Sequence, residues 1–328
     1  MSDPTVSIAG QVVEHLRSRR LLSADASVET VPLSGGVSND VLAVTGPGVD
    51  VVVKHALQQL RVAEDWQANP GRIRTEGRAL QVAAELLPDS VPKVFDSSNG
   101  FLVIERAPAE WRVWKQSLLE GQIDIPLARS LGEWLGQWQV ATEHRADLRE
   151  EFSSQSVFTD LRINPFHRTV AARHPDLAEQ ISDVLTAMAA DRRCIVHGDF
   201  SPKNILIGPS GQSWIIDWEV VHTGDPTFDP AWIVGHLLLK SIRRRDLATE
   251  YEAAAAAFLA GRDRHAGSQV PLNPQQLARQ VGCLVLSRVD GKSPVDYLDG
   301  PGRDLARSLA HALLLDTPQS VNNVWRLL

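Results

Sequence analysis

The sequence has 328 residues, which is enough for one large domain or two ordinary ones with a substantial core. Its net charge of −7 does not favour nucleic acid or an anionic membrane as a partner, and its two cysteines are too few for a disulfide framework or a cysteine-built zinc site. No apolar run approaches the roughly 18 residues that span a bilayer and no signal-peptide core is present, so a cytoplasmic protein is expected.

The first third of the chain predicts an antiparallel sheet. An amphipathic helix over residues 5–22 is followed by short β-branched runs, which Gly, Asn, Pro or Asp separate as in strands joined by turns. One helix interrupts the runs, from about Pro70 to Leu87. The runs cover residues 28–33, 41–46, 49–57, 91–98 and 101–107.

From about residue 109 onward the pattern is mostly helical. The run at 125–141 repeats its apolar residues at helical spacing, and further helical patterns cover 174–190, 230–262, 274–288 and 303–315. We therefore expect an α+β fold in two lobes. Residues 1–107 would form one lobe with an antiparallel sheet and one main helix, and residues 108–328 a larger, mostly helical lobe.

Polar side chains gather in the segment CIVHGDFSPKNILIGPSGQSWIIDWE, residues 194–219. An apolar run ends at His197-Gly198-Asp199, and Asn204 follows Asp199 by five residues. Two further strands, 205–207 and 214–216, are expected on either side of a turn. Asp217 stands at the end of the second strand, 18 residues after Asp199.

This spacing suits phosphoryl transfer. The reaction needs a carboxylate that orients and deprotonates a hydroxyl, the role predicted for Asp199, and hard oxygen ligands for Mg²⁺, the role predicted for Asn204 and Asp217. Glu219 lies on the same side of the strand as Asp217, where it either assists a second metal or is solvated. Taken singly these residues also fit a hairpin with solvated acids at its ends, but the set in this order favours catalysis.

The string HGDFSPKNILI, followed by IIDWE and GDPTFDPAW, resembles the aminoglycoside phosphotransferase family, protein-kinase-like small-molecule kinases that include choline, homoserine and methylthioribose kinases. The resemblance implies a bilobal protein-kinase-like fold, ATP and Mg²⁺ as cofactors, and a small-molecule hydroxyl acceptor. It places Asp199 at the catalytic-base position and Asn204 and Asp217 at the metal-ligand positions. Asp229 matches the buried Asp that braces the catalytic loop in relatives.

The N-terminal half supplies further candidates for binding the nucleotide. Lys54 lies inside an apolar strand, where its charge needs a partner, and Glu76 on the following helix is the predicted one, with Glu85 as the alternative. The strand before Arg106 fits a hinge that holds adenine through the backbone of Glu105 and Ala107. Between two strand runs lies a turn whose backbone N–H groups either cover phosphates or only make a hairpin. The residues of this turn are Ser34, Gly35, Gly36 and Ser38.

The acceptor is less well defined. The segment at 51–80 resembles methylthioribose kinases, which favours a sugar or thiosugar, with an amino alcohol or an aminoglycoside as alternatives. Lys203 either reaches the transferring phosphoryl group or is a surface lysine. Three further groups either line the acceptor site or have ordinary structural and surface roles. They are the loop of Arg288, Asp290 and Lys292, the basic run of Arg162, His167, Arg168 and Arg173, and the aromatic set of Trp111, Trp114, Trp134 and Trp138.

Two other classes of function remain open. A catalytically silent kinase-like binding module would have lost at least one of the key residues, whereas all are present. A metal-dependent hydrolase could use Asp199, Asp217, Asp225 and Asp229, but it leaves Lys54 unexplained. The oligomeric state expected is a monomer or a homodimer.

Overall fold

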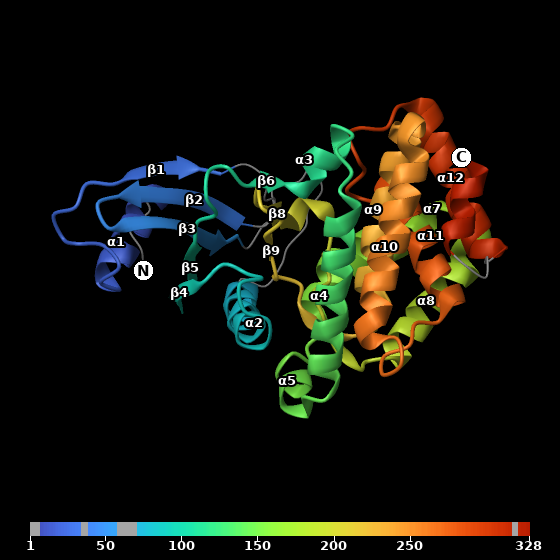
Figure 1. Ribbon diagram of the computed structural model, residues 1–328. Helices are drawn as coiled ribbons and strands as arrows, with labels where there is room; N and C mark the ends of the chain where they lie inside the picture. Colours follow the sequence, from blue (N-terminus) through green and yellow to red (C-terminus); the bar gives the residue numbers. More distant parts are fainter. Residues whose placement is uncertain (1–6, 34–38, 58–70, 317–320) are drawn as a thin grey trace. The chain divides into compact units, whose positions relative to one another are not determined.

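The computed structural model describes residues 7–33, 39–57, 71–316 and 321–328 (Figure 1). The chain divides into two compact units, one of Met1–Glu110 with Ile216–Glu219, the other of Trp111–Ile215 with Val220–Leu328. The first unit ends three residues later than the boundary expected from the sequence. It also takes in the segment that follows the last strand of the catalytic motif, so that Asp217 and Glu219 belong to the first unit.

The first unit contains the predicted antiparallel sheet. Its strands lie in the order β1-β2-β3-β5-β4, so the last two neighbours are reversed relative to the sequence. The fold class predicted from the sequence is confirmed here, because all five expected runs form strands. They are β1 (Glu29–Pro32), β2 (Asn39–Gly46), β3 (Val49–Ala56), β4 (Val94–Ser98) and β5 (Phe101–Glu105).

Two helices cover opposite faces of this sheet. Helix α1 (Ile8–Ser18) packs its Val12 and Leu16 against the face that carries Val51 and Val53. Helix α2 (Arg72–Leu86) packs on β4 and β5. Since side chains alternate along a strand, Lys54 lies on the face opposite to Val53, which is the face of α2.

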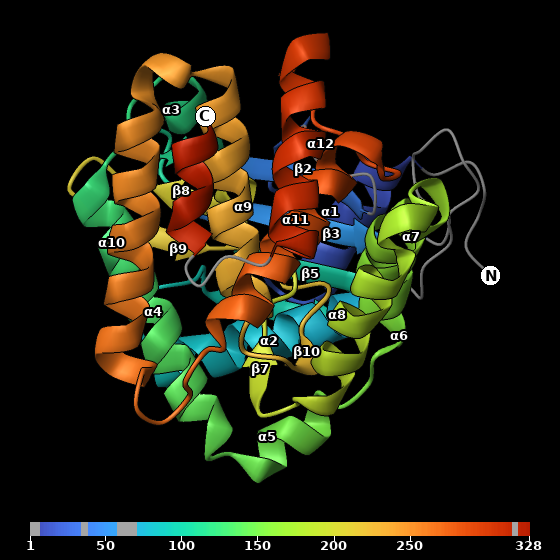
Figure 2. The ribbon, with the colours of Figure 1, turned by 90° about the vertical axis from the view of Figure 1, so that its right-hand side faces the viewer.

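The second unit is mainly helical (Figure 2). The first part of it holds α3 (Trp114–Leu119), α4 (Ile125–Glu143), α5 (Ala146–Glu151), α6 (Ser156–Phe158), a π-helix (Thr159–Arg168), α7 (Thr169–Arg173) and α8 (Ala178–Ala190). The second part holds α9 (Phe228–Arg243), α10 (Ala248–Ala266), α11 (Pro274–Asp290) and α12 (Gly300–Leu315). In the described part of the chain, no helix is long and apolar enough to cross a membrane.

Short strands support the catalytic segment. Strand β7 (Cys194–Val196) pairs with β10 (His222–Gly224), while β8 (Ile205–Ile207) lies between β6 (Arg112–Val113) and β9 (Ser213–Ile215). The sequence did not predict β6 or β10, because neither Arg-Val nor His-Thr-Gly forms an apolar run like those of β7 and β8.

The expected helical pattern at 230–262 is broken in the structure. Arg244 leaves the helical conformation with φ −121° and ψ 68°, and a 3₁₀ turn at Arg245–Leu247 separates α9 from α10. The guanidinium of Arg244 bonds both carboxylate oxygens of Asp246 at 3.0 and 2.9 Å. Helical propensity alone does not reveal the break, because the residues around it are ordinary helix formers.

Helices α4 and α10 lie side by side and approach closely through glycines (Figures 1 and 2). A Cβ placed on Gly132 of α4 would lie 1.9 Å from the carbonyl oxygen of Phe258, and one on Gly261 of α10 would lie 2.3 Å from the carbonyl oxygen of Arg129. Both obstacles are backbone atoms, which a rotamer change cannot remove. The interface therefore requires glycine on both helices.

We predict that Gly132→Ala lowers the free energy of unfolding by about 3 kcal/mol, because the added methyl group forces the two helices apart. Gly300→Ala is the matched control. Gly300 is also a helical glycine, but nothing lies within 4 Å of its added Cβ, so the change is expected to be neutral or slightly stabilising. Urea denaturation of both variants measures the difference. Equal stabilities would contradict the close approach of α4 and α10.

Candidate active site

In the first unit, Lys54 lies between two carboxylates. Its Nζ is 2.6 Å from Oε1 of Glu76 and 2.9 Å from Oδ1 of Asp217, while Glu76 is fully buried. The partner is therefore Glu76 rather than Glu85, which is exposed on the same helix. Burial by itself lowers the pKa of Lys54, but the two carboxylates outweigh it and raise the pKa above its usual value. The ammonium therefore stays charged.

Asp217 has an unusual backbone conformation, with φ 68° in the left-handed region. Aspartate tolerates this region better than most residues, but such a conformation still costs free energy and is often found at functional sites. The turn brings its carboxylate onto Lys54, although 22% of the Asp217 side chain remains exposed. Asp217 is thus the accessible member of the cluster.

Glu219 is buried rather than solvated. Its Oε2 accepts hydrogen bonds from Nε of Arg72 and from Nδ2 of Asn39, each at 3.2 Å. Arg72, which opens α2, is itself buried and also donates to the carbonyl of Leu57 at 2.9 Å. Sequence reasoning missed Arg72. A basic residue in the first turn of a helix, where the helix dipole disfavours it, was the available signal.

The other candidates in the first unit are placed only in part. Ser34, Gly35, Gly36 and Ser38 lie outside the described residues. Glu105 ends β5 and its backbone N–H donates to the carbonyl of Lys93 at 2.8 Å, so that group is already occupied. Ala107 lies beyond the strand and is half-buried. The predicted hinge would therefore have to bind adenine through the carbonyl of Glu105 and the backbone groups of Ala107.

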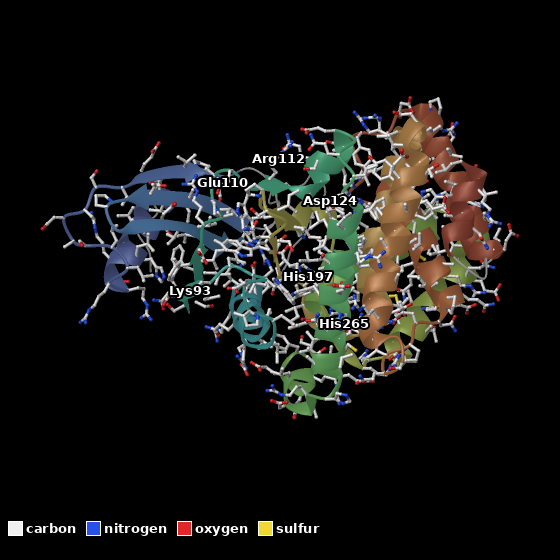
Figure 3. All side chains as sticks on the ribbon, in the orientation of Figure 1. Lys93, Glu110, Arg112, Asp124, His197 and His265 are labelled. Carbon is white, nitrogen blue, oxygen red and sulfur yellow. The ribbon has the colours of Figure 1, made fainter. Side chains whose placement is uncertain are left out.

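The predicted catalytic loop of the second unit runs from β7 to β8 and is held by Asp229. Its two carboxylate oxygens accept the backbone N–H groups of His197 at 2.8 Å and Gly198 at 3.0 Å. Gly198 has φ 80°, and a Cβ there would lie 2.7 Å from the carbonyl oxygen of Val220, so only glycine fits. The His197 ring, labelled in Figure 3, accepts the backbone N–H of Asp199 at Nδ1, 3.1 Å away. His197 thus shapes the loop.

Asp199 is a buried carboxylate surrounded by donors. Its Oδ2 lies 2.8 Å from Nη2 of Arg162 and 2.9 Å from both Nζ of Lys203 and Nδ2 of Asn204, while Oδ1 accepts Nε1–H of Trp232 at 3.0 Å. Burial alone raises the pKa of Asp199. The charges of Arg162 and Lys203 outweigh burial, and the pKa lies far below its usual value.

Lys203 reaches the site on an otherwise exposed side chain. Half of the side chain is accessible while its Nζ contacts Asp199. Asn204, next in the chain, uses both hydrogens of its amide nitrogen on Asp199, at 3.0 Å to the carbonyl and 2.9 Å to Oδ2. Its amide oxygen is therefore the atom left to bind a cation.

Arg162 differs from the expectation of a solvated basic run. It lies on the π-helix, is 7% exposed, and donates from Nε to the carbonyl of Gly198 at 3.0 Å as well as pairing with Asp199. His167 on the same helix is buried as well, which lowers its pKa to about 4. Arg168 and Arg173 are exposed, as expected for surface residues. The sequence around Arg162 gives no local signal of its burial, because the carboxylate that compensates it, Asp199, lies 37 residues away.

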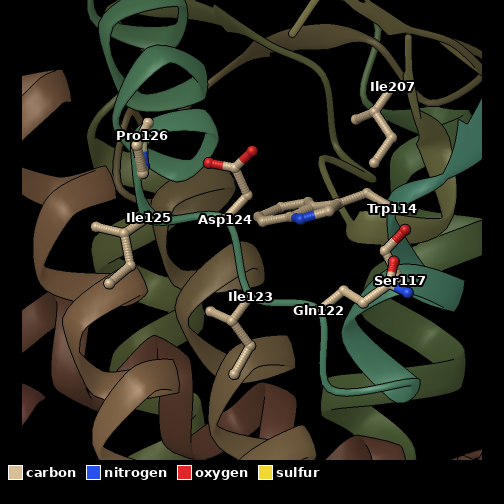
Figure 4. Close-up of a pocket in the computed structure, with 8 residues that line it drawn as sticks. All are labelled: Trp114, Ser117, Gln122, Ile123, Asp124, Ile125, Pro126 and Ile207. Carbon is tan, nitrogen blue, oxygen red and sulfur yellow. The ribbon is translucent and has the colours of Figure 1, made fainter. Parts of the chain in front are cut away.

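Three of the four candidate tryptophans pack against other aromatic rings, and the fourth lines a pocket. Trp134 stacks between Trp138 and Phe200, with ring centroids 5.8 and 5.7 Å away, and Trp138 donates to the carbonyl of Ile195 at 2.7 Å, so these rings support the catalytic loop. Trp114 lines a hollow of about 510 Å³ beside Asp124 (Figure 4). Trp111 packs against Trp214, with ring centroids 4.9 Å apart.

Asp290 and Arg288 lie near the end of α11. Asp290 joins neighbouring helices, because it accepts from the ring of His174 at 2.9 Å and from Arg307 at 2.9 and 2.8 Å. Arg288 donates to the hydroxyl of Ser293 at 3.1 Å. Lys292 is exposed and its backbone N–H donates to the carbonyl of Pro165. Of the three, Asp290 therefore has a structural role.

Two features define the class of protein-kinase-like phosphotransferases. One is a lysine that a helix glutamate and a strand-end aspartate hold. The other is a loop in which a buried Asp is followed five residues later by Asn. Residues 29–268 of this chain match the model of the Phosphotransferase enzyme family. The chain therefore belongs to this family.

The chain is similar to curated methylthioribose kinases. It is 26% identical to one from Pectobacterium atrosepticum in an alignment of length 290 that covers 75% of this chain and 71% of that protein. It is 23% identical to one from Bacillus cereus in an alignment of length 266 that covers 71% of this chain and 66% of that protein. The chain thus spans about two thirds of the length of the curated relatives it matches.

Solved structures confirm the fold. An amicoumacin kinase in complex with AMP-PNP and Ca²⁺ superposes with a TM-score of 0.62 at 13% identity, covering 98% of both chains. The choline kinase LicA from Streptococcus pneumoniae gives 0.53 at 14% identity, covering 94% of this chain and all of that one. The predicted family, the protein-kinase-like fold and the class of small-molecule kinase are confirmed at this level.

We predict that Arg162→Met lowers the free energy of unfolding by about 3 kcal/mol, because it leaves the buried Asp199 with one charged partner fewer. Arg168→Met is the matched control on the same helix, and it should change stability by less than about 0.5 kcal/mol. In an Asp199→Asn background, the loss caused by Arg162→Met should shrink, since no buried charge is then left uncompensated. Denaturant titration of the parent protein, Arg162→Met, Asp199→Asn and the double variant measures the coupling, and additive effects would contradict the pairing.

Proposed function

We propose that the protein is an ATP-dependent kinase that phosphorylates a hydroxyl of a small metabolite, with a sugar or thiosugar favoured by the similarity to methylthioribose kinases. The observation that carries the proposal is the buried Lys54, fixed between Glu76 and Asp217. An ammonium so held is a preformed partner for nucleotide phosphates. In this reading ATP contacts Lys54 in the first unit, together with the loop at Ser34–Ser38 and the hinge at Glu105–Ala107.

Asp199 is the proposed catalytic residue. It would accept a hydrogen bond from the acceptor hydroxyl and take its proton as the phosphoryl group is transferred. Since its pKa is far below the usual value, Asp199 stays ionised and acts as a weak base. Such a carboxylate orients the hydroxyl throughout and removes the proton late. Lys203, which contacts Asp199, is placed to balance the charge that develops on the phosphoryl group.

The donor atoms present fit Mg²⁺, which takes hard oxygen ligands. Asp217 in the first unit offers a partly exposed carboxylate, and Asn204 in the second unit offers its amide oxygen. When bound, Mg²⁺ supplies positive charge that neutralises the nucleotide phosphates. Glu219 accepts hydrogen bonds from Arg72 and Asn39. We therefore propose that it mainly positions these two residues, and that it is a weaker candidate metal ligand than Asp217. The described residues hold no group of three or more His, Cys, Asp or Glu arranged around a metal position.

The competing functions are less well supported. A hydrolase would need Asp225 and Asp229 as free ligands, but Asp229 braces the catalytic loop and Asp225 accepts from Thr227 and Gln280. A silent binding module does not explain why Lys54 is held charged. We further propose a cytoplasmic protein, monomeric or homodimeric, with no nucleic-acid or membrane partner.

We predict that Asp199→Asn lowers kcat about 10³-fold while ATP binding is retained, because the carboxylate is lost but its shape is kept. Asp217→Asn should instead weaken Mg²⁺-dependent ATP binding at least about 10-fold. Asp304→Asn, at an exposed position of α12, is the control and should match the parent protein. ADP release and calorimetric titration with ATP, with and without Mg²⁺, separate the two effects. Full turnover by the Asp199→Asn protein would rule out the mechanism.

We also predict that Glu76→Gln raises the KM for ATP about 10-fold, since Lys54 loses a charged partner worth roughly 1.4 kcal/mol of its positioning. Glu85→Gln tests the same substitution on the exposed side of the same helix and should leave the KM unchanged. Steady-state kinetics with ATP as the varied substrate measure both. An equal effect of the two variants would argue against the proposed nucleotide site.

A further inference from the structure

One face of α9 contacts the carboxylate of Asp199 at Trp232 and extends from there along the helix. Trp232, His236 and Lys240 are spaced by four residues, so they share a face of the helix. Trp232 donates to Asp199, its ring lies 6.5 Å from that of His236, and Nζ of Lys240 donates to the carbonyl of His236 at 3.2 Å. Lys240 therefore stands two turns, about 12 Å along the helix axis, from the residue that touches Asp199.

Cations gather along this path from several elements. Nζ of Lys240 and Nζ of Lys115 lie over the same ring, that of Tyr297, at 5.6 and 5.9 Å. The guanidinium groups of Arg162 and Arg288 likewise lie over the ring of Phe166, each at 5.8 Å. Arg162 is compensated by Asp199. In the described part of the chain, no carboxylate lies within 4.0 Å of Lys240, Lys115 or Arg288. Asp199 and Asp296 act on Arg288 from farther away, whereas burial and other cations dominate at Lys240.

Such an arrangement is unfavourable without a further partner. Lys240 is 1% exposed, and burying a charged group costs several kcal/mol unless an opposite charge offsets it. Burial, and then the charges of Lys115 and Arg288, lower the pKa of Lys240 to about 7. Two neighbouring polar atoms, Nε of Arg288 and the hydroxyl of Tyr297, are buried without a hydrogen-bond partner among the described residues. All these features point to an anion that is absent from the chain itself.

We propose that the acceptor of this kinase carries an anionic oxygen group, a carboxylate or a phosphate ester, which Lys240, Arg288 and Tyr297 bind while its hydroxyl lies at Asp199. The inference rests on the proposed kinase function and narrows its substrate class. A cationic amine would be repelled by these residues, and a neutral sugar would leave the buried Lys240 without a counter-charge. The acceptor thus differs in charge from choline and aminoglycosides.

The first experiment compares acceptors of matched skeleton and different charge. ADP release is measured with ATP and Mg²⁺ for glycerol, glycerate and glycerol phosphate, and for glucose, glucosamine, gluconate and glucose 6-phosphate. We expect an anionic member to give a kcat/KM at least about 10-fold above that of its neutral and amine counterparts. The carboxylate and phosphate arms show which anion the site takes. Preference for a neutral or amine acceptor would overturn the inference and leave the proposed function intact.

The second experiment assigns the effect to Lys240. Lys240→Met should raise the KM for the best anionic acceptor about 10- to 100-fold, with a smaller effect on kcat. Its thermal stability should be equal to or above that of the parent, because an uncompensated buried charge is removed. Lys93→Met is the matched control: Lys93, labelled in Figure 3, also lies over an aromatic ring, Phe95 at 5.4 Å, but on the surface. Equal KM values in the two variants would contradict the assignment.

A binding measurement decides the case in which no acceptor releases ADP, an outcome that would contradict the proposed function. Inorganic phosphate is added at fixed ionic strength to protein saturated with ADP and Mg²⁺, and the melting temperature is recorded. Phosphate should raise the melting temperature of the parent protein and the Lys93→Met variant by several degrees, but not that of Lys240→Met. No shift, or the same shift in all three proteins, would overturn the anion site.

Discussion

Burial of the Asp199 carboxylate costs several kcal/mol unless its charge is offset, and the second unit is arranged around that requirement. The compensating groups come from three separate elements: Arg162 from the π-helix, Lys203 from the catalytic loop and Trp232 from α9. These elements must therefore pack in register with one another. The same carboxylate that would perform the chemistry thus also fixes where the helices around it can lie.

A second carboxylate holds the loop itself. Asp229, in the first turn of α9, accepts the two backbone N–H groups that precede Asp199, and three residues farther along the helix Trp232 bonds the carboxylate of Asp199. A single helix thereby fixes both the backbone and the side chain of the catalytic loop. The positive φ of Gly198 permits the turn that makes this double contact. Displacing α9 would consequently disturb the loop at two points.

Much of the fold and part of the candidate site were predictable, because they depend on short-range patterns in the sequence. Strand and helix periodicity located the sheet and most helices, and an isolated lysine in an apolar strand indicated an acidic partner. The burial of Arg162 and His167 was not predictable in the same way, since a basic residue is buried only when distant residues compensate it. The same reason explains why the sequence did not assign residues 216–219 to the first unit or identify Arg72 as the partner of Glu219. The break at 244–247 lacks any Pro or Gly signal.

The candidate site residues of the two units have opposite net charge. This difference suits a metal-bound nucleotide in the first unit and an anionic acceptor in the second. In the first unit three carboxylates, Glu76, Asp217 and Glu219, meet two cations, Lys54 and Arg72, an excess of one negative charge suited to a metal-bound nucleotide. Nucleotide phosphates do not explain the cations of the second unit equally well. Lys203 and Arg162 contact Asp199, where the phosphoryl group would be transferred, but Lys240 lies two turns of α9 farther on and meets Lys115 at Tyr297. A phosphoryl group at Asp199 would leave those cations uncompensated, so the anion they require belongs to the acceptor.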